Sequence, residues 1–235
     1  MINYAHRGAS EYAPENTLSS FYLGLLQGAN GIETDVQRTK DGVLVLFHDD
    51  TVDRVSDHSG KLSEFTLEEL KRVKIYGNCT TGFYDRIPTL REFLEKFSQY
   101  DISFAIELKG EAVEEETLEM VKEFGIMNKT TFTSFNFQYI KKIKELDSSA
   151  RVGWLTSSVD DEVVARLLEI GGEEIAPKAS LITKELMEKW RNAGLGVRAW
   201  GVSDIVLMKK MCHFEVDGMT VNFPDRLQEF LVAIK

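Results

Sequence analysis

Short apolar runs alternate with amphipathic stretches along most of this chain of 235 residues. Alternation at this spacing predicts parallel strands joined by right-handed helical crossovers. The number of strand–helix units favours a closed (β/α)8 barrel over an open doubly wound sheet, and the length is near the ~250 residues typical of such barrels. The expected strands cover residues 2–5, 32–36, 43–47, 102–108, 130–135, 151–156, 174–177, 196–202 and 218–222. The expected helices cover residues 18–27, 89–97, 112–124, 137–146, 160–170, 183–192, 205–211 and 226–234.

Two carboxylates occupy alternate positions of the second apolar run, at Glu33 and Asp35. Side chains alternate between the two faces of a strand, so both carboxylates point to the same face. A further apolar run ends in His48 and Asp49, after a connection too short for a crossover helix. This pair of runs departs from simple strand–helix alternation. Paired acids and a histidine at strand ends indicate a metal site with an acid/base group beside it.

Other polar side chains follow apolar runs where a barrel places its active site, at the C-terminal strand ends. His6 and Arg7 follow the first run, and Glu107 and Lys109 close the run that begins at residue 102. Two histidines that can transfer protons near neutral pH, His6 and His48, would then face one end of the barrel. The cations Arg7 and Lys109 and the carboxylates Glu33, Asp35 and Glu107 would face the same end. Three carboxylates suit Ca²⁺ or Mg²⁺, histidines suit proton transfer, and arginine matches phosphate oxygens. The set predicts metal-assisted phosphoryl chemistry.

Residues 51–86 interrupt the alternation with a polar stretch that holds a short helix signal at 66–70 and a turn-prone patch at 77–82. We expect an insertion over the barrel rim within one domain of residues 1–235. It is long enough to shape a pocket and too short for a second domain.

The formal net charge of −10 argues against a nucleic-acid surface and against docking to anionic membranes. An anionic substrate would therefore need local positive charge. No apolar run approaches the roughly 20 residues that span a bilayer, so we expect no stable membrane insertion. The opening residues lack the basic and apolar regions of a signal peptide, which predicts a cytoplasmic protein. Cys79 and Cys212 are expected to be reduced thiols.

Three groups of motifs lie at the predicted strand ends: His6-Arg7-Gly8-Ala9 with Pro14-Glu15-Asn16-Thr17, Glu33-Thr34-Asp35-Val36-Gln37 with Thr39-Lys40-Asp41-Gly42 and His48-Asp49, and Glu107-Leu108-Lys109. They resemble the motifs of the glycerophosphodiester phosphodiesterase family. The similarity extends through Pro88-Thr89-Leu90, Ser134-Phe135 and Trp200 to Pro224-Asp225, and so covers nearly the whole chain. The first two groups of motifs together are highly specific.

The resemblance implies a TIM barrel with a small insertion after the His48 strand. It implies hydrolysis of a small-molecule glycerophosphodiester to glycerol 3-phosphate and an alcohol, with one Ca²⁺ or Mg²⁺ as cofactor. The following roles are implied by the matching positions: His6 and His48 as the general acid/base pair, Glu33, Asp35 and Glu107 as metal ligands, Arg7, Lys109 and Trp200 as substrate contacts, and Asn16 as a supporting residue. Attack by the glycerol 2-hydroxyl through a cyclic phosphate and direct attack by water both stay open.

Two positions depart from the family pattern. Asn222 replaces the usual acid, and Gly201 follows Trp200 where threonine is common. We expect neither to contact the metal ligands or the proton-transfer groups. Asn16 is the expected N-cap of the first helix, and Phe132, Phe135 and Phe137 are expected in the core.

Other interpretations stay open from the sequence. Glu33 and Asp35 could form an internal ion network with Arg7 and Lys109, and Trp200 could be core packing. A lysophospholipase D-like activity would need an apolar entrance, whereas the insertion is polar. A catalytically silent barrel that binds phosphodiesters would be expected to lack an acid/base or metal residue, and none is lacking. The oligomeric state is not fixed by the sequence.

Overall fold

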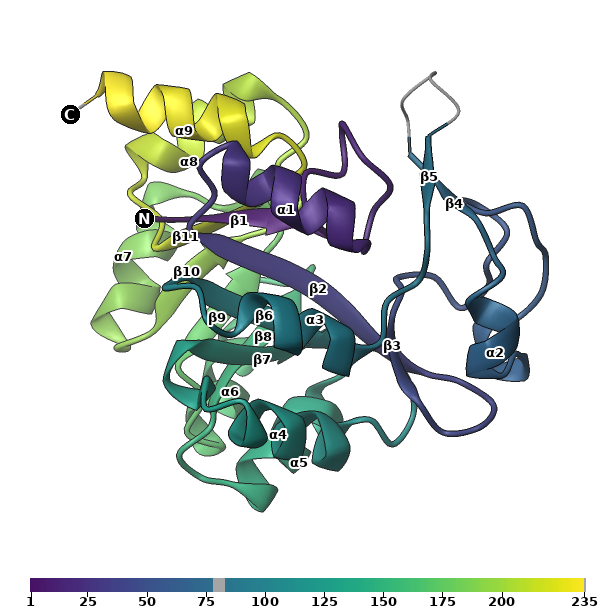
Figure 1. Ribbon diagram of the computed structural model, residues 1–235. Coiled ribbons are helices and arrows are strands. Elements are labelled where there is room, and N and C mark those ends of the chain that lie inside the picture. The colour runs from purple at the N-terminus through teal and green to yellow at the C-terminus, as the bar shows by residue number, and fades with distance from the viewer. Residues whose placement is uncertain (78–82, 235) are drawn as a thin grey trace.

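The computed structural model describes residues 1–77 and 83–234 and shows a closed barrel of eight parallel strands ringed by helices (Figure 1). The barrel closes where β1 pairs with both β2 and β11. The barrel strands are β1 (Ile2–His6), β2 (Gly31–Arg38), β6 (Ser103–Leu108), β7 (Thr130–Ser134), β8 (Arg151–Thr156), β9 (Glu174–Pro177), β10 (Gly196–Ala199) and β11 (Gly218–Val221). The surrounding helices are α1 (Leu18–Leu26), α3 (Leu90–Phe97), α4 (Glu114–Glu123), α5 (Phe137–Leu146), α6 (Asp161–Glu169), α7 (Lys184–Asn192), α8 (Ile205–His213) and α9 (Pro224–Ala233). The predicted TIM barrel is confirmed.

Helix α3 illustrates how an amphipathic sequence packs a helix onto the outside of the barrel. Its residues Leu90, Phe93, Leu94 and Phe97 follow helical spacing and are all fully buried against the barrel. The side chain of Thr89 caps the helix by accepting a hydrogen bond from the backbone of Glu92. The burial of one apolar face thus sets the position of each helix on the barrel.

The first helix begins at Leu18 as expected, but its N-cap lies one residue later than expected. Thr17, not Asn16, is the N-cap of α1, and its side chain accepts a hydrogen bond from the backbone N–H of Ser20. The expectation for Asn16 was therefore wrong. Its backbone has a positive φ of 53°, which differs from the extended conformation usual at an N-cap.

The two apolar runs on either side of residue 40, which departed from strand–helix alternation, form an antiparallel β-hairpin. Strand β3 (Leu44–Leu46) pairs with the end of β2, with Val36 opposite Leu46. The backbone N–H of Phe47 donates to the carbonyl of Asp35 at 3.0 Å. The hairpin therefore carries His48 back beside the carboxylates of β2.

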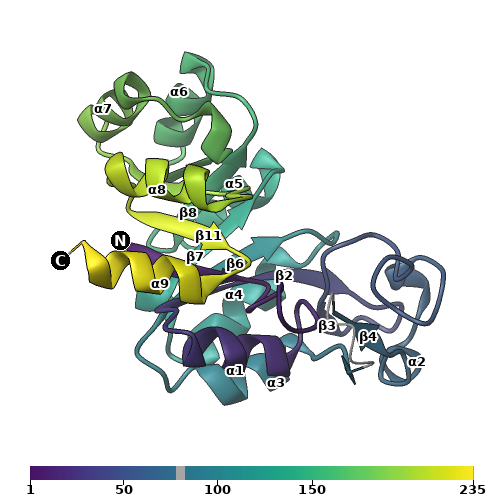
Figure 2. The same cartoon turned by 90° about the horizontal axis from the view of Figure 1, so that it is seen from above.

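The insertion after β3 has its own small core. Its elements are the 3-10 helix η1 (Leu62–Glu64), α2 (Leu67–Leu70), β4 (Ile75–Tyr76) and β5 (Tyr84–Asp85). Buried side chains such as Val52, Leu62, Leu70 and Ile75 pack together there. Figures 1 and 2 both show α2 and β4 beyond β3 at one end of the barrel. Residues 78–82 of the expected turn, Cys79 among them, lie outside the described residues, whereas Cys212 is a buried free thiol.

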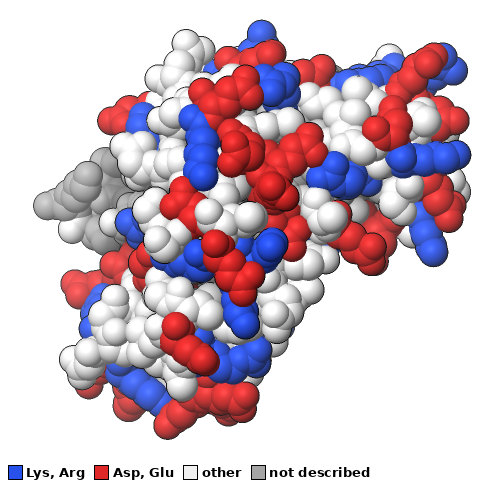
Figure 3. Space-filling view, turned by 90° about the horizontal axis from the view of Figure 1, so that it is seen from below, with Lys and Arg blue, Asp and Glu red and all other residues white. Residues whose placement is uncertain are grey.

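Two further 3-10 turns complete the elements, η2 (Met127–Lys129) and η3 (Ala179–Leu181). No helix within the described residues is long and apolar enough to cross a membrane. Figure 3 shows the molecule from below, with basic and acidic side chains interspersed. The acidic side chains gather near the centre of this face.

Candidate active site

Three buried carboxylates meet at the C-terminal end of the barrel. Glu33 and Asp35 lie on β2 and Glu107 lies on the adjacent β6, where Asp35 is in register with Glu107. Each residue offers an oxygen, and the three oxygens all lie within 4.8 Å of one another. The three side chains are almost fully buried. Parallel pairing of β2 and β6 thus brings together the acids that the sequence placed at two separate strand ends.

The electrostatics of this cluster differ from acid to acid. Burial, with the charge of Asp35, raises the pKa of Glu107 to about 7, and the same effects raise the pKa of Glu33 well above its usual value. Burial alone would also raise the pKa of Asp35, but the charges of Arg7, His48 and Lys109 lower it to about 2. The protein therefore holds a fixed negative charge at Asp35 and two protonatable acids beside it.

The cluster fits a divalent cation. Its donors are carboxylate oxygens, the ligands that hard cations prefer. Oδ1 of Asp35 is buried and accepts no hydrogen bond from the described residues. Such an oxygen is costly without a partner, and a cation would supply one.

Two cations and one amide hold Asp35 in place. Nε of Arg7 lies 3.3 Å from Oδ2 of Asp35, and Nζ of Lys109 lies 3.8 Å from its Oδ1. Nδ2 of Asn16 donates to Oδ2 of Asp35 at 2.8 Å, and Oδ1 of Asn16 accepts from the Thr34 hydroxyl. Arg7 and Asn16 both have positive φ values, which cost energy in side-chain-bearing residues. The motifs that contain Arg7 and Asn16 thus form a loop whose backbone conformation directs both side chains to the Asp35 carboxylate.

His6 lies at the end of β1 with its two ring nitrogens in different surroundings. Its Nε2 is 3.9 Å from Glu33. Its Nδ1 is 2.6 Å from Oδ1 of Asn222. This contact contradicts the expectation that Asn222 stays away from the proton-transfer groups. The reason is barrel closure, because β1 pairs directly with β11 and Asn222 follows β11.

The contact with Asn222 favours one form of the His6 ring. When the amide oxygen accepts a hydrogen bond from Nδ1, the lone pair of a neutral ring lies on Nε2. Burial and the charge of Arg7 lower the pKa of His6 to about 4, against the opposing effects of Asn222 and Asp35. His6 is therefore a neutral ring at physiological pH, with its acceptor nitrogen on the side of Glu33.

His48 has a carboxylate partner instead of an amide. Its Nδ1 lies 2.5 Å from Oδ1 of Asp49, and Nε of Arg54 lies 2.5 Å from Oδ2 of the same carboxylate. The two η nitrogens of Arg54 donate to Glu15 at 2.9 and 2.7 Å, and Glu15 also pairs with Arg7 at 2.9 Å. A chain of ion pairs therefore joins the insertion to both sides of the site.

A cavity of about 190 Å³ lies among these groups. Its polar lining includes His6, Arg7, Glu33, His48 and Glu107. Phe135, Leu155 and Trp200 add an apolar wall. The indole nitrogen of Trp200 donates to the Thr156 carbonyl at 3.2 Å, and its role as a substrate contact stays a prediction.

Comparisons with known proteins agree with this geometry. Residues 6–226 match the model of the glycerophosphoryl diester phosphodiesterase family. A glycerophosphodiester phosphodiesterase of Caldanaerobacter subterraneus is 33% identical over 231 residues, which cover 95% of this chain and 94% of that protein. The chain belongs to the glycerophosphodiester phosphodiesterase family. Its members are phosphoric diester hydrolases, and this chain is one of them.

Solved structures show the same fold. An Oleispira antarctica phosphodiesterase in complex with its product sn-glycerol 3-phosphate superposes with a TM-score of 0.87, at 31% identity over 97% of this chain and 96% of that one. A glycerophosphodiester phosphodiesterase of Thermotoga maritima superposes with a TM-score of 0.79, at 26% identity over 100% of this chain and 99% of that one.

Some residues of this phosphodiesterase site were not found from its sequence. Phe135 was expected in the core, yet 45% of its surface is exposed and it lines the cavity. Its ring packs edge-on against Trp200, so the family motif and not its apolar character was the useful signal. Arg54 lies in a polar stretch with no periodicity, and only the fold reveals its partners.

Proposed function

We propose that this chain hydrolyses glycerophosphodiesters, such as glycerophosphocholine or glycerophosphoethanolamine, to sn-glycerol 3-phosphate and an alcohol. The observation that carries the proposal is the pair of histidines beside the buried acids, each with a different partner on Nδ1. The product bound to the Oleispira relative supports this substrate class.

The proposed cofactor is one Ca²⁺ or Mg²⁺ ion, held by Glu33, Asp35 and Glu107. A divalent ion in such a site polarises a phosphate oxygen and stabilises negative charge in the transition state. The protein's own contribution is a buried, preorganised set of oxygens. Lys109 and Arg7 lie around that set and would bind the remaining phosphate oxygens.

His6 is the proposed general base. Its neutral ring can take a proton on Nε2 from the nucleophile, which is the glycerol 2-hydroxyl or a water molecule. Asn222 keeps the proton on Nδ1 and so fixes the tautomer that this step requires. A carbonyl-type partner suits a ring that begins the reaction uncharged.

His48 is the proposed general acid. The Asp49 carboxylate on its Nδ1 suits a ring that carries positive charge, because opposite charges attract most strongly at hydrogen-bond distance. As the bond from phosphorus to the alcohol oxygen breaks, Nε2 of His48 donates its proton to that oxygen. If a cyclic phosphate has formed, water then opens it with the two histidines in exchanged roles.

The experiment that tests the function is release of sn-glycerol 3-phosphate from glycerophosphocholine and glycerophosphoethanolamine. Purified protein is assayed with Ca²⁺, with Mg²⁺ and with a chelator, beside His6→Ala. We expect turnover that both the chelator and the substitution abolish. His58→Ala is the matched control, since His58 is exposed and pairs with Asp57 in the insertion. Absence of release with either metal would overturn the proposal, and lysophospholipids in the same assay would then test a phospholipase D-like activity.

A further inference from the structure

Arg198 is a charged residue in the barrel interior that the mechanism above does not use. It lies on β10 with 1% of its surface exposed. Its Nε donates to Oε1 of Glu174 at 2.8 Å and its Nη1 donates to the Thr220 hydroxyl at 3.0 Å. Its Nη2 is buried and has no hydrogen-bond partner within the described residues. The guanidinium also lies 5.5 Å from the centre of the Tyr4 ring. A buried N–H without an acceptor is costly, and a ligand oxygen in the adjoining cavity would supply one.

Two glycines leave the space for this side chain. A Cβ atom on Gly153 would lie 2.6 Å from Oε1 of Glu174. A Cβ atom on Gly218 would lie 2.9 Å from the ring of Tyr4 and 3.3 Å from Cγ of Arg198. Barrel interiors are usually filled by branched apolar side chains. The interior here is instead arranged around an ion pair.

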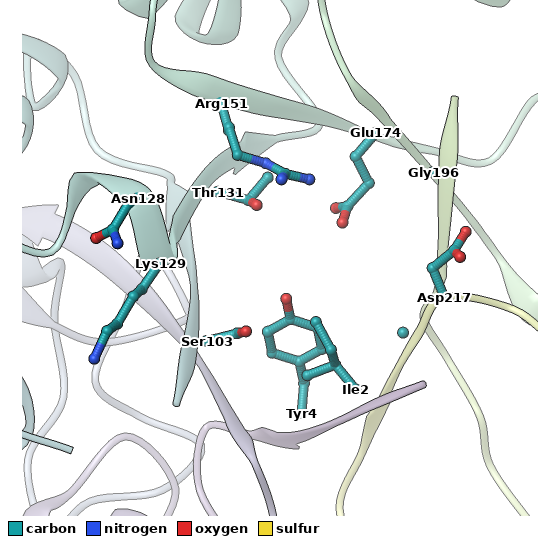
Figure 4. A pocket seen from close by; sticks show the side chains of 11 residues that line it. Ile2, Tyr4, Ser103, Asn128, Lys129, Thr131, Arg151, Glu174, Gly196 and Asp217 are labelled. Carbon is teal, nitrogen blue, oxygen red and sulfur yellow. The ribbon is translucent and has the colours of Figure 1, made fainter. Parts of the chain in front are cut away.

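The partner of Arg198 faces the opposite end of the barrel. Glu174 lines a separate cavity of about 280 Å³ at the N-terminal strand ends. Figure 4 shows its carboxylate turned toward that cavity, as are the hydroxyls of Tyr4 and Ser103. Arg198 lines the active-site cavity. The ion pair therefore spans the interior, with its cation on the side of the active site.

Arg198 and Thr220 form the floor of the active-site cavity. Each precedes by two residues a group at the rim, Trp200 and Asn222 respectively, and so lies one layer deeper on the same face of its strand. In the proposed binding mode, the phosphate lies near Arg7 and Lys109, the glycerol carbons lie along the apolar wall, and the end carbon farthest from phosphorus points toward the floor.

We propose that Arg198 is a substrate-specificity residue that donates a hydrogen bond to the free terminal hydroxyl of the glycerol moiety. The inference rests on the proposed function and deepens it, because it names the part of the substrate that the cavity floor recognises. The substrate class is then a glycerophosphodiester whose terminal hydroxyl is free. An acyl group on that oxygen would make it a weaker acceptor and would need additional space beside Arg198 and Thr220.

The test compares two ligands that differ only in this hydroxyl. One is sn-glycerol 3-phosphate and the other is propane-1,2-diol 1-phosphate. Calorimetric titration of the metal-loaded protein gives both dissociation constants for the native chain and for variants. The main variant is Glu174→Gln with Arg198→Met, which removes the guanidinium without leaving a buried charge unpaired. Glu174→Gln alone keeps the guanidinium and reports the effect of disturbing the pair.

We expect the double variant to bind sn-glycerol 3-phosphate about tenfold more weakly and to bind the diol phosphate as the native chain does. Glu174→Gln alone should keep the preference for the glycerol compound. Equal weakening for both ligands would overturn the inference, since a purely structural role disturbs the whole cavity. Unchanged binding of both ligands would overturn it as well.

The outcome for the native chain separates this inference from the proposed function. If the native chain binds neither phosphate, the proposed function fails. If it binds both without preference, the function stands and the role of Arg198 fails. Thermal unfolding of each variant, recorded beside the titrations, identifies any variant that is not folded.

Discussion

The side-chain oxygen of Asn222 lies 2.6 Å from Nδ1 of His6, although the two residues are 216 positions apart in the sequence. Closure of the barrel between β1 and β11 creates this contact. An amide at this position orients the ring without adding charge to it. The second histidine, His48, has a carboxylate partner on its Nδ1. This difference is the reason for the different roles proposed for the two rings.

Asn222→Asp should shift the pH dependence of catalysis. The new carboxylate would favour a protonated His6 ring and raise its pKa from about 4. Because a protonated His6 cannot act as a base, the acid limb of kcat/KM should move upward by about one pH unit. The measurement is kcat/KM for glycerophosphocholine across the acid and neutral range. Asn128→Asp, at the opposite end of the barrel, adds the same charge and should leave the limb in place. An unmoved limb in Asn222→Asp would contradict the role given to His6.

Stabilisation by metal should increase with pH. Burial and neighbouring carboxylates raise the pKa of Glu33, and they raise that of Glu107 to about 7. In the metal-free protein these raised pKa values favour folding below the usual pKa of glutamate, and this contribution is lost as pH rises through about 7. A cation needs the ionised acids, so binding competes with protons at low pH.

The increase in Tm produced by saturating Ca²⁺ or Mg²⁺ should therefore be several degrees larger at about pH 8 than at about pH 5.5. Thermal unfolding at both pH values, with metal and with chelator, gives the comparison. Glu107→Gln should reduce the difference between the two pH values. An equal shift at both would show that the acids are already ionised at the lower pH.

Arg54→Ala should slow catalysis while it leaves the fold intact. Arg54 pairs with Asp49 beside His48 and with Glu15 beside Arg7, so its removal frees both carboxylates to move. We expect kcat/KM to fall about tenfold, because small displacements of catalytic groups are costly. The drop in Tm should be small for a side chain that is 49% exposed. Arg72→Ala, in an exposed pair of the same insertion, is the control and should change neither quantity. Equal kcat/KM values for Arg54→Ala and Arg72→Ala would show that the ion pairs of Arg54 do not position the catalytic groups.

The barrel and the acids could be predicted because both depend on local pattern. Alternating strand and helix signals fix the topology, and parallel strands then bring their C-terminal ends to one rim. Glu33, Asp35 and Glu107 stand at those ends, so their convergence follows from the fold class.

The missed features depend on contacts that no local pattern encodes. The contact of Asn222 with His6 needs the first and last strands to be neighbours. The partners of Arg54 depend on how a stretch without periodicity folds over the rim. Arg198 had a usable signal, a charge within an apolar strand run, but its partner Glu174 lies on a different strand. The bounds of the insertion, residues 51–86, stay a prediction from the sequence.

The most direct test of the account is the dependence of each histidine variant on the leaving group. His6→Ala and His48→Ala are assayed on glycerophosphocholine and on the p-nitrophenyl ester of glycerophosphate, whose phenolate leaves without a proton. If His48 is the general acid, His48→Ala should lose roughly a hundredfold or more in activity on the choline ester and far less on the nitrophenyl ester. His6→Ala should lose similar factors on both, since both need a base. Equal losses for His48→Ala on the two esters, or rescue of His6→Ala instead, would contradict the assignment of base and acid.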